Sequence, residues 1–189
     1  MFVESVQVNH ASLLEEARRG GEEAFLTLYS QHRNAVFRFA FHMTGSIATA
    51  EDVTQECFLA MVRGSEFDPC KARLQAWLFG IARHIVFRHL RISGHESEQL
   101  AETATTADAL DEILSAERSE MVRQAIASLP ALQREAILLF EYDELSLEEV
   151  ATVTGADVGA IKARLRRARE SLRKLLEPLL RHKTEGSCS

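Results

Sequence analysis

Apolar residues recur every three or four positions along almost the whole chain, and this spacing constrains the fold more than any other feature. One face of an α-helix has that period, whereas a half-buried strand needs strict alternation of apolar and polar residues. No stretch alternates for long enough to indicate a sheet, and only three prolines interrupt the 189 residues. We therefore expect an all-α protein.

Breaks in the apolar pattern divide the chain into helices. A polar, acidic stretch from about residue 92 to 106 has no apolar stripe and is interpreted as a linker. Thr49, with Asp52 three residues later, predicts the N-cap of the third helix, and Pro130 suits the first turn of a later one. The expected helices cover residues 11–19, 22–43, 48–63, 72–91, 108–128, 131–142, 147–153 and 158–180.

This division predicts two small helical domains joined by an acidic, flexible linker. We expect the domains at 1–92 and 107–182, the linker at 93–106 and a tail at 183–189. Because an ordinary domain takes about 100 to 200 residues, each half can bury only a modest core.

The formal charge of -6 is distributed unevenly. Residues 1–91 carry 10 basic and 10 acidic side chains, residues 92–156 carry 3 and 14, and residues 157–183 carry 9 and 3. The net charge alone argues against a polyanionic partner. The basic segment near the C-terminus reverses that inference and makes nucleic acid a candidate partner.

Several classes of protein are excluded by patterns that the sequence lacks. No stretch approaches the roughly 20 apolar residues of a membrane span, and no signal peptide opens the chain, so we expect a cytoplasmic protein without membrane insertion. Cys57, Cys70 and Cys188 are widely spaced, which favours free thiols. The seven histidines form no metal-ligand pattern, and no catalytic motif occurs. We expect no enzymatic activity, no metal and no cofactor.

A helix-turn-helix is predicted near the C-terminus. Ser146 and Glu149 form a capping box that begins one helix. Gly155 can take the left-handed conformation that ends this helix, and Asp157 can cap the next one. Two helices joined by a short glycine turn are the arrangement that places a recognition helix in the major groove of DNA.

The second of these helices has an apolar side and a basic side, at about 100° per residue. Arg164 and Arg169 flank the apolar side, where we expect phosphate contacts or pairing with acidic neighbours. A merely solvated face is the simpler alternative, but its coincidence with the helix-turn-helix favours DNA binding. The side that should pack inward carries Val158, Ile161, Leu165, Ala168 and Leu172. The side available to a groove carries Gly159, Lys162, Ala163, Arg166 and Arg167.

Two helices of the first domain combine an apolar stripe with polar side chains. On helix 72–91, aromatic residues interleave with arginines, which suits stacking on single-stranded nucleic acid and contact with its phosphates. Each aromatic residue taken singly, such as Trp77, is equally compatible with a place in the core. On helix 48–63 we expect solvent to contact Asp52, Gln55 and Glu56, and the core to contain Val53, Phe58 and Leu59.

In order, three segments resemble the extracytoplasmic-function group of bacterial RNA polymerase sigma factors, in the sigma-70 family. The pattern A-E-D-x-x-Q-E-x-F is met by residues 50–58, W-L-x-x-I-A-R by 77–83, and G-x-x-K-x-R-L-x-R-A-R by 159–169. The resemblance spans most of the chain. It implies a region 2 helical bundle at 1–92 and a region 4 helix-turn-helix at 107–182.

The resemblance also implies roles for individual residues. His84 and Arg88 stand where the family often has Asn and Asp, a departure that bears on the preferred minus-ten sequence. Core RNA polymerase, through the clamp-helix coiled coil of its largest subunit, would bind Asp52, Gln55 and Glu56. The melted non-template strand of the minus-ten element would contact Arg73, Trp77, Arg83, His84 and Arg88. The minus-thirty-five duplex would be read by Gly159, Lys162, Ala163, Arg166 and Arg167.

The function implied is promoter-specific initiation of transcription, with core RNA polymerase, promoter DNA and an anti-sigma factor as partners. A conventional helix-turn-helix regulator, whose first domain senses a ligand or dimerises, is the main alternative. A purely protein-binding helical adaptor is another, although it does not explain why the basic face coincides with a helix-turn-helix.

Overall fold

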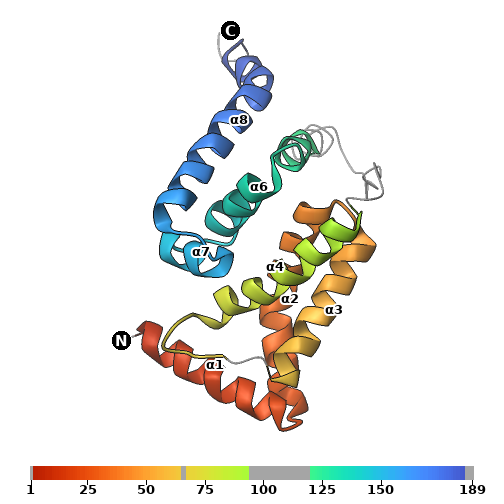
Figure 1. Ribbon diagram of the computed structural model, residues 1–189, viewed down its shortest axis with the longest axis vertical. Coiled ribbons are helices and arrows are strands. Elements are labelled where there is room, and N and C mark those ends of the chain that lie inside the picture. The colour runs from red at the N-terminus through yellow and green to blue at the C-terminus, as the bar shows by residue number, and fades with distance from the viewer. Residues whose placement is uncertain (1, 65–66, 94–119, 186–189) are drawn as a thin grey trace.

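The structure, a computed structural model, describes residues 2–64, 67–93 and 120–185. All regular elements within these ranges are helical (Figure 1), as the spacing of the apolar residues predicts. They are α1 (Phe2–Arg18), α2 (Glu22–Thr44), α3 (Ile47–Arg63), α4 (Leu74–Ser93), a helical stretch at 120–127, α6 (Ala131–Ile137), the π-helical turn η1 (Leu138–Tyr142), α7 (Leu147–Thr154) and α8 (Val158–Glu185).

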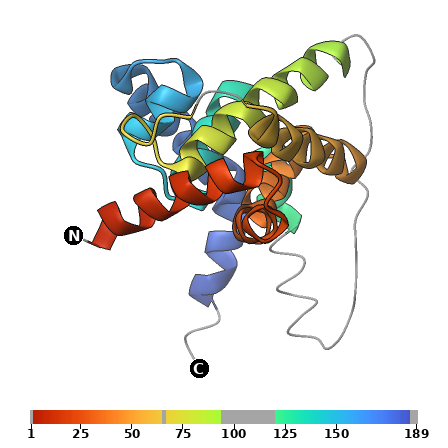
Figure 2. The ribbon, with the colours of Figure 1, turned by 90° about the horizontal axis from the view of Figure 1, so that it is seen from below.

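Helices α1 to α4 form an N-terminal bundle with an aromatic core. Phe39 and Phe79 meet edge to face there, with ring centroids 5.5 Å apart. Helix α1 begins at Phe2 rather than at residue 11, runs across the end of the bundle and contacts α2, α3 and α4 (Figures 1 and 2). The crossing is fixed by Arg18, whose Nε donates a hydrogen bond of 3.2 Å to the carbonyl of Met61.

The start of α3 differs from the prediction. Its N-cap is Ser46 and not Thr49, because the Ser46 hydroxyl accepts a 3.2 Å hydrogen bond from the amide of Thr49. Gly45, with a left-handed φ of 74°, ends α2 directly before this cap. The left-handed residue lets the chain turn into the extended conformation that Ser46 adopts as an N-cap.

The apolar face of α3 is narrower than predicted. Val53 and Phe58 are buried as expected, but the side chain of Leu59 is 41% exposed. One residue is about 100° of helical rotation, so Leu59 lies beyond the edge of the stripe that contains Phe58. The inward orientation predicted for Leu59 is therefore wrong.

The helical stretch 120–127, α6, η1, α7 and α8 form a C-terminal bundle. Its predicted helix 131–142 is α-helical only to Ile137, and the amide of Asp143 then bonds across a wider turn to the carbonyl of Leu138 at 3.1 Å. The wider turn keeps Leu138 in the core and brings Asp143 against the N-terminal bundle.

Other predicted boundaries fall partly outside the described residues. Ser93 is the last residue of α4, and the rest of the predicted linker 93–106 is outside the described ranges, as are the first part of helix 108–128 and tail residues 186–189. Pro130 is the N-cap of α6 rather than a residue of its first turn.

The helix-turn-helix forms as predicted. Ser146 and Glu149 make the capping box of α7, each side chain pairing with the backbone of the other residue. Gly155 ends α7 with a left-handed φ of 67°. The carboxylate of Asp157 accepts a 2.9 Å hydrogen bond from the amide of Ala160 and so begins α8.

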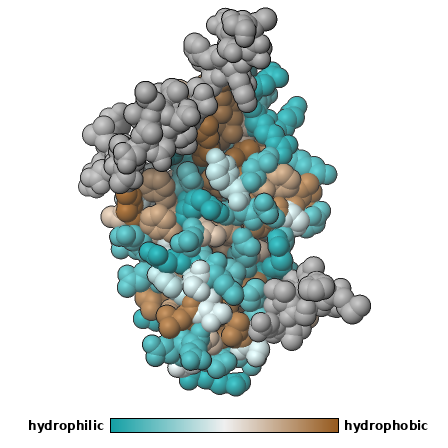
Figure 3. All heavy atoms as spheres, turned by 180° about the vertical axis from the view of Figure 1, so that it is seen from behind, coloured by the Kyte–Doolittle hydropathy of each residue, from teal (hydrophilic) through white to brown (hydrophobic). Residues whose placement is uncertain are grey.

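The two bundles share one continuous hydrophobic core. Helix α4 packs against α7, while α2 contacts both α6 and η1 (Figure 1). Seen from behind, the surface is largely hydrophilic with apolar residues scattered over it (Figure 3). Side-chain packing between the two bundles therefore fixes how they lie relative to each other.

A pH-dependent contribution to stability follows from His32. Burial, together with the neighbouring His10, lowers the pKa of His32 from 6.5 to about 4. The unfolded chain therefore takes up this proton at a higher pH than the folded chain, and stability is lost as the pH falls from about 6.5 to 4.

Between pH 7 and pH 4.5, we expect the free energy of unfolding to fall by about 2 kcal/mol less in His32→Gln than in the parent protein. Urea unfolding followed by circular dichroism at a series of pH values measures this slope. His84→Gln, a change at an exposed histidine, is the control and should keep the slope of the parent protein. An unchanged slope in His32→Gln contradicts the assignment.

Candidate functional site

The basic face of α8 points away from the core. Lys162, Arg166 and Arg167 are exposed, whereas Ile161 and Leu165 are buried on the opposite side. The predicted separation of the two sides of this helix is confirmed. We call Gly159, Lys162, Ala163, Arg166 and Arg167 the reading face.

Gly159 also serves the helix start. A Cβ atom at this position would lie 2.9 Å from Oδ1 of Asp157, the oxygen that caps α8. The absence of a Cβ atom at Gly159 leaves room for this carboxylate oxygen.

Arg169, one of the two arginines predicted to flank the apolar side of α8, is paired within the C-terminal bundle. Arg169 forms an ion pair of 2.5 Å with Glu141 in η1, and its guanidinium lies 5.6 Å from the centre of the Phe140 ring. Of the two roles expected for Arg169, pairing with an acidic neighbour is the one observed.

The predicted polar surface of α3 is open to solvent in part. Asp52 and Gln55 are exposed. Glu56 accepts two hydrogen bonds from Arg88 on α4, at 2.5 and 2.6 Å, and these bonds lower the pKa of the Glu56 carboxyl. The structure thus joins two residues that the sequence assigns to separate sites.

Arg73, directly before α4, and Arg83, within α4, pair with carboxylates of the C-terminal bundle. Arg73 forms a two-pronged ion pair with Glu149 of α7, in which Nη2 lies 2.7 Å from Oε2. Arg83 donates from Nε to Oε1 of Glu135 on α6 at 2.7 Å. Two of the residues predicted to contact DNA therefore hold carboxylates of the other bundle.

The sequence left open whether Trp77 lies in the core or is available for stacking on a base, and its surroundings are intermediate. It is partly buried, its ring centroid lies 5.2 Å from that of Phe67, and the guanidinium of Arg18 lies 5.9 Å from the indole. His84, two turns further along α4, is exposed.

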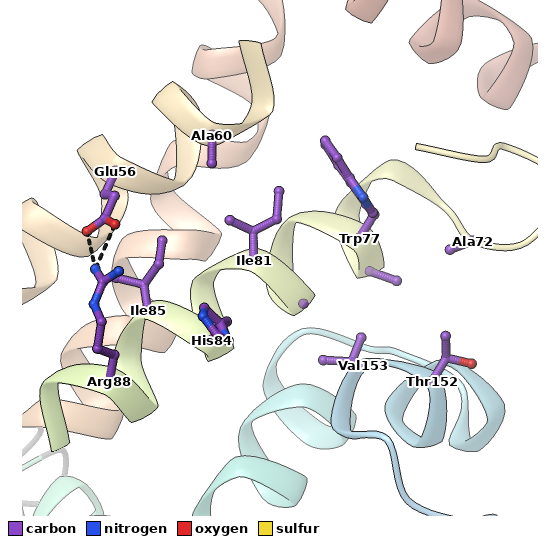
Figure 4. A pocket seen from close by; sticks show the side chains of 12 residues that line it. Glu56, Ala60, Ala72, Trp77, Ile81, His84, Ile85, Arg88, Thr152 and Val153 are labelled. Atoms are coloured by element: carbon purple, nitrogen blue, oxygen red, sulfur yellow. Dashed lines mark hydrogen bonds and ion pairs between the residues drawn. The ribbon is translucent and has the colours of Figure 1, made fainter. Parts of the chain in front are cut away.

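A pocket of 460 Å³ lies among α3, α4 and α7 (Figure 4). Figure 4 shows the Glu56–Arg88 pair at one end and Trp77 toward the other, with Thr152 and Val153 of α7 facing α4. Small residues on α4, including Gly80, leave this space open.

Comparison with known proteins assigns both bundles. The family model of sigma-70 region 2 matches residues 28–95, and that of sigma-70 region 4 matches residues 119–172. The chain is 31% identical over 180 residues to the ECF RNA polymerase sigma factor SigW of Bacillus subtilis, across 88% of this chain and 96% of that protein. The chain belongs to the extracytoplasmic-function (ECF) sigma factors of RNA polymerase.

Further relatives of this sigma factor cover its whole architecture. It is 31% identical over 192 residues to the ECF RNA polymerase sigma-E factor of Escherichia coli, across 94% of this chain and 99% of that protein. The sigma factor RpoE of Bartonella quintana, solved in complex with the anti-sigma factor NepR, has 29% identity and a TM-score of 0.65 over 81% of this chain and 96% of that one. CnrH, in complex with the cytosolic domain of CnrY, has 26% identity and a TM-score of 0.68 over 90% and 98%.

These matches decide between the readings that the sequence left open. Both bundles of this sigma factor match sigma regions, so a conventional regulator with a separate sensing domain and a helical adaptor are not supported.

None of the helices in the described part of the chain combines the length and apolarity of a membrane span. Within the same residues, no cluster of His, Cys, Asp and Glu side chains is arranged to hold a metal ion.

Sequence reasoning missed the acidic residues that link region 4 to region 2. Asp143 accepts a 2.8 Å hydrogen bond from Arg38 of α2. Glu135 accepts a hydrogen bond from Arg83, and Glu149 accepts one from Arg73. A signal existed for Glu135, a charged residue next to the apolar run 136–140. Such a residue is buried only when it has a partner.

The reading face predicts a salt-dependent interaction with duplex DNA. We expect Arg166→Ala combined with Arg167→Ala to weaken binding to a duplex of randomised sequence at least about tenfold and to reduce the slope of log affinity against log salt by about 2. Fluorescence anisotropy titrations at several salt concentrations measure both quantities.

The matched control is Arg173→Ala with Lys174→Ala, which removes the same charge from exposed positions further along α8. It should weaken binding much less. Equal effects from the two double variants would indicate general attraction to a basic helix rather than a reading face.

Proposed function

We propose that this sigma factor binds core RNA polymerase through Asp52, Gln55 and Glu56, contacts the minus-ten element through α4, and reads the minus-thirty-five element with α8. The observation that carries the proposal is that the motifs lie on separate surfaces. Asp52 and Gln55 on α3 and the basic side chains of the reading face are exposed at the same time, so polymerase and upstream duplex can be bound together.

Binding of the minus-thirty-five duplex is supported by the electrostatics and geometry of α8. Its first turn is free of acidic side chains, and its exposed side presents Lys162, Arg166 and Arg167 next to the small residues Gly159 and Ala163. Small residues permit close approach of the helix to a groove, while arginine can donate two hydrogen bonds to guanine. The N-terminal part of a recognition helix is the part that contacts bases.

Binding of the melted minus-ten strand is supported by the composition of α4. Trp77 offers a ring for base stacking, His84 is exposed, and Arg73, Arg83 and Arg88 carry charge for phosphates. Each of these arginines has a carboxylate partner in the free protein. Contact with DNA therefore requires an exchange of carboxylate for phosphate.

An anti-sigma factor is the remaining partner that we propose. RpoE of Bartonella quintana is solved with the anti-sigma factor NepR, and CnrH with the cytosolic domain of CnrY. Both are similar to this chain over most of its length. The solved relatives thus support an anti-sigma partner for this sigma factor.

Polymerase binding is tested by reversing the charge at Asp52. We expect Asp52→Lys to weaken binding to core RNA polymerase about tenfold. A polymerase surface complementary to Asp52 would be basic, and the lysine would repel it. Anisotropy of labelled sigma factor measures affinity, and run-off transcription on promoters selected from a genomic pool measures activity.

Glu23→Lys on α2 reverses an exposed charge away from the α3 surface and is the matched control. Thermal unfolding verifies that both variants fold. Wild-type affinity in Asp52→Lys sinks the α3 assignment, and a protein that supports no transcription with core polymerase from any selected promoter sinks the proposed function.

A further inference from the structure

Among the residues that the structure describes, three ion pairs join region 2 to region 4, and all three have the same polarity. Every arginine comes from region 2, and every carboxylate comes from region 4. We call these the bridging pairs: Arg38–Asp143, Arg73–Glu149 and Arg83–Glu135. The side chains of Asp143 and Glu135 are 2% and 0% exposed, so they are almost completely withdrawn from water, whereas that of Glu149 is 20% exposed.

We propose that the free sigma factor is closed on itself, with Glu149 and Glu135 of region 4 occupying Arg73, directly before α4, and Arg83, within α4, in place of DNA phosphates. The inference rests on the proposed role of α4 in binding the minus-ten strand. A carboxylate presents arginine with the same pair of acceptor oxygens as a phosphate does. Region 4 therefore competes with single-stranded DNA for Arg73 and Arg83.

The geometry of Glu149 supports this competition. One of its oxygens accepts from Nη2 of Arg73 at 2.7 Å and also from the backbone amide of Ser146 at 2.9 Å. Glu149 therefore both completes the capping box of α7 and pairs with Arg73. This pair joins the first turn of the helix-turn-helix to the residue directly before α4.

Other contacts align the same interface. Arg134 of α6 donates from Nη1 to the carbonyl of Met43 at the end of α2, at 2.8 Å. Gln75 of α4 donates to the carbonyl of Asp143 at 3.4 Å. Polar contacts thus reach α2 and α4 from two elements of region 4, which fixes one orientation of the regions.

Buried ion pairs such as Arg83–Glu135 and Arg38–Asp143 add little net stability to the closed form. Burial raises the pKa of Glu135 and of Asp143 even though each has an arginine partner. Burial therefore outweighs the arginine partner in setting the pKa of each carboxyl. We expect polymerase or a polyanion to open this interface.

Closure leaves the reading face free. Lys162, Arg166 and Arg167 remain exposed on the far side of region 4. The proposal therefore separates two activities that are otherwise expected to change together. Opening should increase binding of single-stranded DNA, while duplex binding through α8 should not change.

The first test uses Asp143→Asn with Glu149→Gln. Gln at 149 retains the capping box of α7, so the variant removes two bridging charges without removing the cap. We expect its affinity for a short, fluorescein-labelled single-stranded DNA of randomised sequence to rise about tenfold, because a larger fraction of the protein is open. Affinity for a randomised duplex should be unchanged.

The matched control is Glu148→Gln, which changes an exposed acid of the same helix that takes no part in the bridging pairs. It should leave both affinities at the wild-type level. An equal rise in single-strand affinity in this control, or no rise in the double variant, overturns the proposal.

A second test locks the closed form and does not depend on the stability of charge variants. Ala72→Cys and Thr152→Cys, on opposite walls of the pocket between α4 and α7, are joined by a short, thiol-cleavable cross-linker in a Cys70→Ser, Cys188→Ser background. The remaining Cys57 is buried, and burial raises the pKa of its thiol to about 12, so it stays unreactive.

We expect the locked protein to lose single-strand binding, to keep duplex binding, and to recover single-strand binding when the linker is cleaved. Equal single-strand affinity in the locked and cleaved forms refutes closure. The cleaved protein is assayed in parallel for run-off transcription with core polymerase. Transcription without any effect of the lock leaves the proposed function intact and rejects only the closure, whereas absence of transcription from the cleaved protein rejects the function itself.

Discussion

The burial of Glu135 against Arg83 is the constraint on which the arrangement of the two regions depends. The carboxylate is fully buried and comes from α6, while the guanidinium comes from α4, 52 residues earlier in the chain. An ionised carboxylate cannot remain in an apolar interior without a partner. Regions 2 and 4 dock in an orientation that supplies this partner, and the shared apolar core, including the packing of α4 against α7, accompanies it.

The same constraint connects structure to function. Arg73 and Arg83 pair with carboxylates of region 4 in the free protein, and both are among the residues proposed to bind the minus-ten strand. DNA phosphates then replace carboxylates as acceptors for these arginines, so each arginine has an anionic partner in both states. The uneven charge of the sequence acquires a physical meaning, because acidic side chains of the middle segment 92–156 satisfy basic ones of region 2.

Local features of the sequence were sufficient to predict most of the helices. Ser146, Gly155 and Asp157 define the helix-turn-helix because capping acts within one turn of the chain. The two faces of α8 follow from its period. The N-cap of α3 was misplaced since Ser46 and Thr49 are both good caps, and only the left-handed Gly45 selects the first. The turn η1 was not predictable, because a single wide turn leaves the apolar spacing around it nearly unchanged.

The bridging pairs were beyond sequence reasoning for a different cause. Arg38 and Asp143 are 105 residues apart, and Arg73 and Glu149 are 76 apart, so no local pattern relates them. The sequence identified Arg73 and Arg83 as basic residues for DNA, and the structure adds that each is already occupied. Motifs therefore indicated which residues bind, and tertiary packing determines when they are available.

The distance between the two regions tests the central claim most directly. Spin labels on the exposed Cys70 of region 2 and on Arg173→Cys of region 4, with Cys188→Ser, report that distance by pulsed electron resonance. We predict one short, narrow distance distribution in the free sigma factor and a longer one once core RNA polymerase is bound. A free protein with a broad, long distribution, or one whose distribution does not change on binding polymerase, would contradict the account.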